Sequence, residues 1–313
     1  MPIVQQTLAV TAPVFSMLFL GVLLRRWHLI DDAFIKAAST LVFKVSLPAL
    51  LFLSILHADL RTALNPSVLG YFAVATVIGF GFVWLWAVIR VPRADRSAYV
   101  QGSFRGNNGI VGLALATSLY GDYGLSLGGV LGGLVILLYN SLSVVVLEYY
   151  RGTGKVRIGP MFKSMLLNPL MLSVLAAIPF AYFGIKLAPW LDQSGQYLAD
   201  LALPLALICI GGTLILTSLK ASGACALSAS VMKMLVLPAV ATFGAYAAGL
   251  RGADLGILFL YFASPTAAAS YVMARAAEAN HELAAAIIVL TTLAAVVTTN
   301  AGLLILMWLQ LIA

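Results

Sequence analysis

The sequence predicts an all-α polytopic membrane protein, and both its composition and its succession of apolar segments support this fold class. Hydrophobic residues make up 62% of the 313 residues, charged residues make up 9%, and the mean hydropathy is +1.03. Soluble domains carry about a quarter charged residues. Apolar runs long enough to cross a bilayer, about 20 residues each, follow one another along the whole chain. In lipid such runs form helices, because a helix satisfies its own backbone polar groups.

Ten membrane spans are predicted, separated by charged residues or by Gly and Pro. They cover residues 7–25, 37–57, 67–90, 97–120, 124–149, 160–184, 196–218, 224–249, 254–276 and 281–311. No basic region precedes the first apolar run, so we interpret it as a mature first span and not as a cleaved signal. Cys209 and Cys225 are too few, and too apolar in their setting, for a disulfide framework. We expect no metal site and no cofactor.

The charge of the loops predicts the orientation in the membrane. The loops after spans one, three, five, seven and nine hold 12 lysines and arginines, whereas the opposite loops hold three. Positive residues accumulate on the cytoplasmic side. We therefore expect a multi-pass protein of the cell inner membrane with both termini on the periplasmic, or extracellular, side. The net charge of +7 is explained in this way, and no basic stripe with interleaved aromatic residues indicates a nucleic-acid partner.

The fourth span is interrupted at its centre by Arg105-Gly106-Asn107-Asn108-Gly109. Glycine weakens a helix by about 1 kcal/mol relative to alanine. Asparagine competes for backbone hydrogen bonds, and an arginine that faces lipid is costly. One interpretation is a kinked span with a snorkelling arginine. The interpretation that we favour is a discontinuous helix whose broken ends form a solute site.

The second half of the chain repeats the first with an offset of 156 or 157 residues. Leu47-Pro48 in span two matches Leu203-Pro204 in span seven, and the break in span four matches Ser264-Pro265-Thr266 in span nine. Each repeat holds five spans, an odd number, so the two copies must have opposite orientations in the membrane. We therefore predict two inverted repeats, residues 1–155 and 156–313, with paired interrupted helices, which is typical of transporters.

The predicted substrate site lies at the two breaks. The planar guanidinium matches a carboxylate, and the N-terminal ends of half-helices carry partial positive charge. The binding residues that we expect are Arg105, Asn107, Asn108 and Gly109 from span four and Ser264, Pro265 and Thr266 from span nine, with Ser270 as a further hydroxyl. Asn140 in span five and Asn300 in span ten are expected either to brace these breaks or to serve as ordinary interhelical contacts.

Two further cations, Lys44 and Lys233, lie inside the spans. Each is within about two turns of the predicted cytoplasmic face, so we interpret both as snorkelling side chains. No carboxylate lies near the middle of any span, although coupled carriers often keep one there. Sodium ions can also be held by carbonyls and hydroxyls, so proton coupling, sodium coupling and uncoupled transport all stay open.

Several segments resemble the auxin efflux carrier family, within the wider group of bile acid sodium symporters. They are FRGNNGIVGLALATSLYG at 104–121, Leu-Tyr-Asn at 138–140, LALPLALICIGGTL at 201–214, and Lys233 with Pro238 in KMLVLP. The resemblance covers essentially the whole chain and implies an elevator-type secondary transporter. Spans one, two, six and seven would form a dimerising scaffold, and spans three to five and eight to ten would form a mobile transport unit. Spans four and nine would cross at the substrate site.

The resemblance also limits the substrate class. Plant members move auxin, and bacterial relatives are described as carriers of malate, malonate or similar organic anions. This chain has Gly106-Asn107-Asn108-Gly109 where plant members have a proline, and the loop between spans five and six has only about ten residues, which argues against auxin itself. We expect a homodimeric secondary transporter for a small organic anion, or alternatively an anion channel or facilitator with no coupling ion. No HExxH or GxSxG motif stands in a span, so we expect no enzyme.

Overall fold

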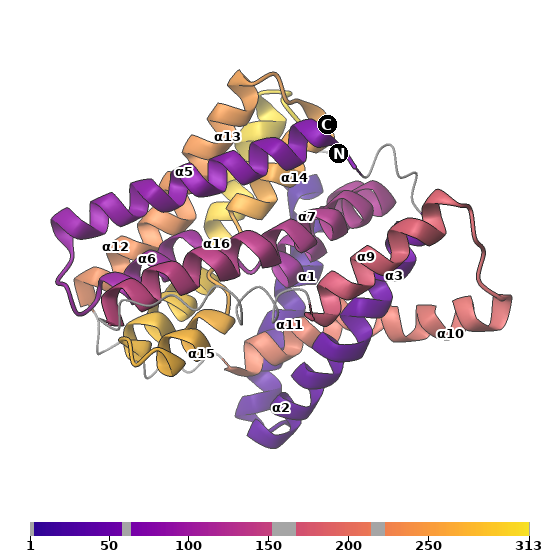
Figure 1. Cartoon of the computed structure of the whole chain (residues 1–313), viewed down its shortest axis with the longest axis horizontal. Helices are drawn as coiled ribbons and strands as arrows, with labels where there is room; N and C mark the ends of the chain where they lie inside the picture. Colours follow the sequence, from indigo (N-terminus) through magenta and orange to yellow (C-terminus); the bar gives the residue numbers. More distant parts are fainter. Residues whose placement is uncertain (1–2, 58–63, 152–166, 214–222, 313) are drawn as a thin grey trace.

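The computed structural model describes residues 3–57, 64–151, 167–213 and 223–312 (Figure 1). Throughout these residues the secondary structure is helical, apart from one isolated bridge between Gly106 and Thr266. Six helical segments are long and apolar enough to cross a membrane, and α9 and α14 are shorter apolar helices. The all-α class of a polytopic membrane protein is confirmed at this level.

The first half of the chain contains two uninterrupted helices, one span with a π-helical turn inside it, and one broken span that is followed by a last helix. Its elements are α1 (Ile3–Arg26), α2 (Asp32–Leu41), η1 (Val42–Ser46), α3 (Leu47–His57), α5 (Pro66–Arg90), α6 (Arg96–Phe104), η2 (Asn108–Gly112) and α7 (Leu113–Arg151). The elements η1 and η2 are π-helical turns. The second part of span four and all of span five make up α7, whose two helical parts meet at a kink at Gly121 (φ 55°, ψ −134°). Glycine adopts this conformation without a steric cost.

The second half of the chain has the corresponding series of helices. They are α9 (Pro169–Tyr182), α10 (Pro189–Asp200), α11 (Ala202–Thr213), α12 (Gly223–Val231), η4 (Met232–Val236), α13 (Leu237–Ala247), α14 (Gly252–Phe262), α15 (Ala269–Ala276) and α16 (His281–Trp308). Three of these helices begin 156 or 157 residues after a helix of the first half, at Pro189, Gly223 and Gly252. The inverted relation of the two halves stays a prediction, and the boundary at 155/156 lies outside the described residues.

The predicted start of span seven is wrong. The structure starts this helix at Pro189, seven residues before the predicted start at 196. Proline suits the first turn of a helix because it has no amide to leave unpaired. The first turns of α10 contain Asp192, Gln193 and Gln196, and these polar residues made an exposed helix look like a loop. The predicted start of span six, at 160, lies outside the described residues.

The helices form two groups that meet along α1, α3 and α7. One group packs α1 against α11 and packs α3 against α9 and α10. The other group packs α16 against α12 and α6, and α13 against α14 and α5. Figure 1 shows the first group around α3, α9 and α11 and the second around α5, α13 and α16. The contacts of α1 with α16 and of α3 with α7 join the two groups.

The two broken helices α6 and α14 enter the second group from opposite ends of the long helix α5. Arg96, the first residue of α6, donates from Nε to Val91 O at 2.8 Å, directly after the C-terminal end of α5. Asp254 in the first turn of α14 accepts from Asn65 Nδ2 at 3.0 Å, next to the N-terminal end of α5. Because α5 has 25 residues, it is about 37 Å long. The two half-helices therefore point toward each other across the thickness of the protein.

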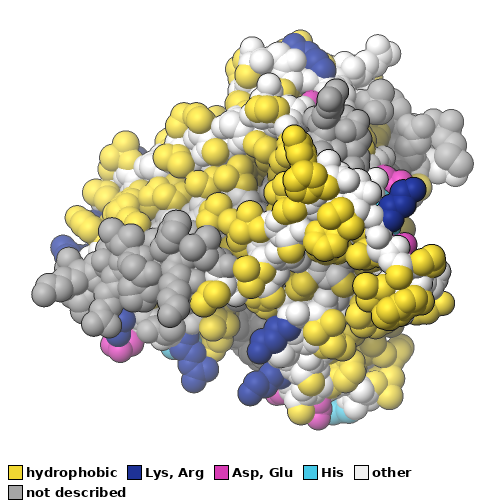
Figure 2. All heavy atoms as spheres, turned by 45° about the vertical axis from the view of Figure 1, so that its right-hand side comes forward, with side chains coloured by type: hydrophobic (Ala, Val, Ile, Leu, Met, Phe, Trp, Pro, Cys, Tyr) yellow, Lys and Arg dark blue, Asp and Glu magenta, His cyan; other side chains and the backbone are white. Residues whose placement is uncertain are grey.

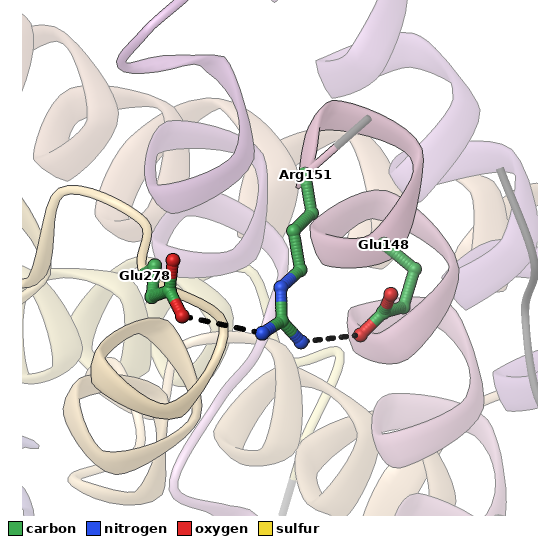
Figure 3. A network of polar contacts seen from close by, with 3 residues as sticks. All are labelled: Glu148, Arg151 and Glu278. Carbon is green, nitrogen blue, oxygen red and sulfur yellow. Dashed lines mark hydrogen bonds and ion pairs between the residues drawn. The ribbon is translucent and has the colours of Figure 1, made fainter. Parts of the chain in front are cut away.

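Polar contacts at both ends hold this second group of helices together. At one end Asp254 also accepts a short hydrogen bond from the Tyr123 hydroxyl of α7. At the other end Arg151 Nη2 lies 3.3 Å from Glu278 Oε1, and Arg151 Nη1 lies 3.6 Å from Glu148 Oε1 (Figure 3). Exposed ion pairs contribute at most about 1 kcal/mol. These contacts therefore orient the helix ends more than they stabilise the fold.

The two ends of the chain lie at the same end of the helix bundle. Figure 1 marks them close together, and Thr7 Oγ1 of α1 lies 3.5 Å from Met307 Sδ of α16. This placement agrees with an even number of membrane crossings. In Figure 2 hydrophobic side chains cover much of the visible face and charged side chains gather toward its margins, as expected for a surface in contact with lipid.

The charge bias of the loops predicts which end of the molecule is cytoplasmic. In a background with both native cysteines replaced by serine, Arg93→Cys should react with a membrane-impermeant thiol reagent only from the cytoplasmic side. Gln193→Cys should react only from outside. Arg93 and Gln193 are both exposed, and they lie on opposite predicted sides of the membrane. Labelling in intact cells and in inverted vesicles measures this, and permeabilised cells give the control. The reverse labelling pattern would overturn the orientation.

Candidate functional site

The two interrupted spans cross at their breaks, and their backbones bind each other there. Asn107 N donates to Pro265 O at 2.7 Å, and Ala267 N donates to Arg105 O at 3.2 Å. These two bonds make the isolated antiparallel bridge between Gly106 and Thr266. Backbone polar groups that a broken helix exposes inside a membrane need partners, because lipid supplies none. Each break supplies hydrogen-bond partners to the other.

Thr266 adds two further contacts to the crossing, and Thr299 of α16 adds a third. The Thr266 hydroxyl donates to Gly102 O at 2.6 Å, and its amide donates to Thr291 Oγ1 of α16 at 3.1 Å. Thr299 of the same helix donates to Ala263 O at 3.5 Å. Threonines of α16 therefore support the span-nine break directly, and Thr266 is a buried structural residue of the crossing.

The lysine of η4 lies at the crossing, so the prediction that Lys233 snorkels is wrong. Its side chain is 1% exposed, and Nζ donates to Phe262 O at 2.9 Å. Phe262 is the last residue of α14, where carbonyls lack partners within their own helix and the dipole is negative. Lys233 thus caps a broken helix end. The sequence held no signal for this role because the acceptor belongs to another span.

The predicted site residue Arg105 is buried beside α7. Its Nη1 lies 3.2 Å from Ser143 Oγ, 3.4 Å from Tyr139 O and 3.2 Å from Met273 Sδ of α15. Its Nε has no hydrogen-bond partner in the described part of the chain. One face of the guanidinium therefore binds the protein, and the Nε donor is left over. None of these three contacts brings a carboxylate to the arginine.

The two asparagines after Arg105 have different environments. Asn108 is fully buried, and its Nδ2 donates to the Tyr139 hydroxyl at 3.3 Å, while its Oδ1 has no partner among the described residues. Asn107 is half-buried and binds the crossing through its backbone. Tyr139 was not predicted as a site residue, although it adjoins the predicted Asn140. Tyr139 belongs to the Leu-Tyr-Asn segment of the family resemblance, but its link to Asn108 spans 31 residues and could not be predicted from the sequence.

A cavity of about 810 Å³ lies against the crossing, between the two groups of helices. Of the predicted site residues, Arg105, Asn107, Asn108, Gly109 and Asn140 line it. The opposite wall comes from α2, η1, α3 and α11, and Lys36 and Lys44 stand at its exposed end. The first residues of η2 and α15 also face it, at Gly109, Ala268 and Ala269. Among the described residues, this lining holds lysine, arginine and asparagine side chains and no carboxylate.

Several predicted site residues lie outside the cavity lining. Ser264 Oγ donates to Leu260 O at 2.8 Å, one turn earlier in its own helix. Pro265 contributes its carbonyl to the crossing, and Ser270 is buried with its hydroxyl unpartnered in the described structure. Asn300 lies where α16 meets α1, and its Oδ1 accepts from Thr11 at 2.7 Å. The structure therefore uses Asn300 as an interhelical contact, one of the two roles expected for it.

Two broken helices that cross beside a cavity are typical of secondary transporters. The model of the membrane transport protein family, which comprises the auxin efflux carriers, matches residues 8–301. The chain belongs to this family. The resemblance on the break residues is thereby confirmed, and the protein is a membrane transporter and not an enzyme.

Two relatives of this auxin efflux carrier family member are archaeal. An uncharacterized transporter of Methanothermobacter thermautotrophicus is 24% identical over 263 residues, which are 83% of this chain and 85% of that protein. An uncharacterized transporter of Methanocaldococcus jannaschii is 22% identical over 277 residues, which are 83% of this chain and 86% of that protein. Both matches extend over most of each chain, so the likeness concerns the whole transporter and not one segment.

The crossing predicts different effects for two glycines three residues apart. A Cβ atom at Gly106 would lie 2.2 Å from Asn108 Oδ1 and 3.1 Å from Lys233 Nζ, whereas a Cβ at Gly109 would meet nothing within 4 Å. Gly106→Ala should therefore lower the melting temperature in detergent, since overpacking costs about 1–3 kcal/mol. Gly109→Ala is the matched control and should melt like the wild type. Equal melting temperatures for the two variants would contradict this account of the crossing.

Proposed function

We propose that this protein is a secondary transporter that moves a small organic anion, with a carboxylate as its recognised group. The observation that carries the proposal is the charge of the crossing cavity, whose described lining includes Lys36, Lys44 and Arg105 and no carboxylate. Lys36 and Lys44 are exposed, whereas Arg105 is buried, and a buried cation without a counter-ion favours an anionic partner. The cavity volume of about 810 Å³ is within the range of small-molecule sites, roughly 300–1,000 Å³.

The backbone at the cavity adds to the attraction for an anion. The helices η2 and α15 start at the crossing. Most of their leading amides are used locally, since Val111 N donates to Asn107 O and Ser270 N donates to Ala267 O. The amides of Gly109 and Ala269 have no backbone partner among the described residues, and a substrate could engage them. Helix N-termini carry partial positive charge and bind carboxylates and phosphates. With Arg105 beside them, the substrate carboxylate would receive a charge-assisted hydrogen bond and backbone donors together. Asn107 and Asn140 then offer amides to a hydroxyl or to a second carboxylate.

The position of the cavity supports an elevator mechanism. It separates α2, η1, α3, α9 and α11, which belong to the proposed scaffold of spans one, two, six and seven, from the crossing helices of the proposed transport unit. Spans three to five and eight to ten would move as one body, because polar contacts tie their ends, such as Asn65 with Asp254 and Arg151 with Glu278. The Thr11–Asn300 contact joins the two bodies and would have to break during the movement.

The remaining parts of the proposal rest on the family and on the sequence. The scaffold would form a homodimer in the inner membrane, with both termini outside, and the lipid bilayer would surround it. Malate, malonate and similar anions fit the cavity chemistry, whereas the Gly-Asn-Asn-Gly break argues against auxin itself. An anion channel or an uncoupled facilitator is the second candidate, because no carboxylate stands ready in the cavity lining to carry a coupling proton. Counter-transport of labelled substrate would distinguish a carrier from a channel.

Binding of malonate to purified protein tests the role of Arg105. Arg105→Gln should fold and lose malonate affinity by roughly 10- to 150-fold, because a charge-assisted hydrogen bond contributes about 1.5–3 kcal/mol. Arg105→Lys should recover only part of the affinity, because a point charge replaces a planar fork. Isothermal titration calorimetry measures this, after a screen of mono- and dicarboxylates has identified a stronger ligand if malonate binds weakly.

The alternative role of Arg105 is purely structural, through its contacts with Tyr139 O and Ser143. In that case Arg105→Gln should lower the melting temperature of the ligand-free protein. Ser143→Ala removes one of these contacts without touching the charge, and it should leave malonate affinity close to that of the wild type. A well-folded Arg105→Gln protein with unchanged affinity would refute the anion site.

Two cysteine pairs, each with one member on α3, test whether the two groups of helices move relative to each other. A Cβ at Gly129 of α7 would lie 3.2 Å from Leu51 Cδ2, and a Cβ at Gly195 of α10 would lie 3.1 Å from Leu53 Cδ1. Cross-linking Leu51→Cys to Gly129→Cys with Hg²⁺ joins the two bodies and should stop uptake into liposomes. Cross-linking Leu53→Cys to Gly195→Cys stays within the scaffold and should permit uptake, with Cys209 and Cys225 replaced by serine in both. Equal uptake by both cross-linked proteins would exclude the elevator.

A further inference from the structure

A second cavity, separate from the anion cavity, lies on the other side of the crossing. It has a volume of about 370 Å³ and lies between α5 on one side and η4 and α13 on the other. Its lining is apolar except for Lys233, Thr76 and two tyrosines. Neither Arg105 nor the Asn107–Gly109 segment belongs to it. The mechanism proposed above makes no use of this space.

The mouth of this second cavity opens toward lipid. Val74 and Ile78 of α5 and Val240 of α13 line it and are 59%, 66% and 66% exposed. These side chains belong to the apolar outer surface of a membrane protein, where the surrounding solvent is acyl chain. A ligand therefore reaches the cavity sideways from the bilayer. A water-soluble dicarboxylate would not take this route.

The inner end of the cavity holds two polar side chains with unused hydrogen-bonding capacity. Lys233 is 1% exposed, and Phe262 O accepts its one hydrogen bond in the described structure, although an ammonium group has three donors. Thr76 is 4% exposed, and its Oγ1 has no partner among the described residues. The lining contains no carboxylate to balance the lysine. A buried cation without a counter-ion is costly, so this end of the cavity favours an anionic group.

From these observations we infer that the cavity is a binding site for a single-chain fatty carboxylate taken from the bilayer. The carboxylate would bind Lys233 Nζ and the Thr76 hydroxyl, and the acyl chain would lie between α5 and α13 and leave past Ile78. Thr76 is near the midpoint of α5, which places the polar end deep in the membrane. A volume of about 370 Å³ has room for one short acyl chain with its carboxylate, whereas a phospholipid with two chains and a headgroup is too large for it.

Photolabelling of the full-length protein in nanodiscs tests the inference, with a decanoate that carries a diazirine near its chain end. Label should appear on α5 and α13 around Ile78 and Val240. Unlabelled decanoate should compete at least about tenfold better than decan-1-ol, which has the same chain without the charge. Equal competition by the two compounds, label on α3 and α11, or displacement by malonate would overturn the inference.

Two glycines of α5 provide a steric variant and its control. A Cβ at Gly79, which lines the cavity, would make an ordinary contact of 3.4 Å with Leu237, whereas a Cβ at Gly81 would meet nothing. Gly79→Leu should fill the cavity and reduce the labelling of α5 and α13 to the background of wild-type protein that was not irradiated, while Gly81→Leu should label like the wild type. Lys233→Met should reduce labelling at least about tenfold. Because Gly79→Leu leaves the Lys233 contact with Phe262 intact, labelling that survives in this variant would exclude the site even if Lys233→Met fails to fold.

Discussion

The whole arrangement depends on how two interrupted helices satisfy their backbones inside a membrane. Lipid offers no hydrogen bonds, so an amide or carbonyl freed by a break needs a partner from the protein or from a water-filled cavity. Here the breaks bind each other through Asn107 N to Pro265 O and Ala267 N to Arg105 O, and the threonines of α16 supply further partners. A single broken span would leave these groups unpaired. The second break is therefore a structural requirement of the first.

The crossing also explains why two cations are buried near its centre. Both α6 and α14 end there, and the C-terminal ends of helices are negative. Lys233 caps the end of α14 through Phe262 O, and Arg105 directly follows α6 and binds Tyr139 O of α7. The two side chains line different cavities, Lys233 the lipid-facing one and Arg105 the larger one. The protein carbonyls orient these cations, and among the described residues Arg105 Nε and two of the three donors of Lys233 Nζ have no hydrogen-bond partner.

The two groups of helices are held by different kinds of contact. Within the crossing group, polar contacts at both ends, such as those of Asp254 and of Arg151, link helices that are distant in sequence. Within the other group, close backbone packing dominates, since a Cβ at Gly21 of α1 would lie 2.1 Å from Ile208 O of α11. Between the groups lie the large cavity and the Thr11–Asn300 contact. Such a division is what a moving body and a fixed body need.

The sequence by itself determined the membrane class, both breaks, and eight of the ten span starts to within about five residues, while the start of span six lies outside the described residues. Hydropathy and Gly/Pro punctuation are local properties, so they can be read without a fold. The polar start of α10 was missed because an exposed amphipathic turn has no apolar run to mark it. Only the tertiary structure decided which polar residues meet. Lys233, Tyr139 and Thr291 join the crossing, while Asn300 faces α1. The rotation of each helix and the angle at which two helices cross decide what a side chain contacts. A span that is apolar on every face shows neither of these in its sequence.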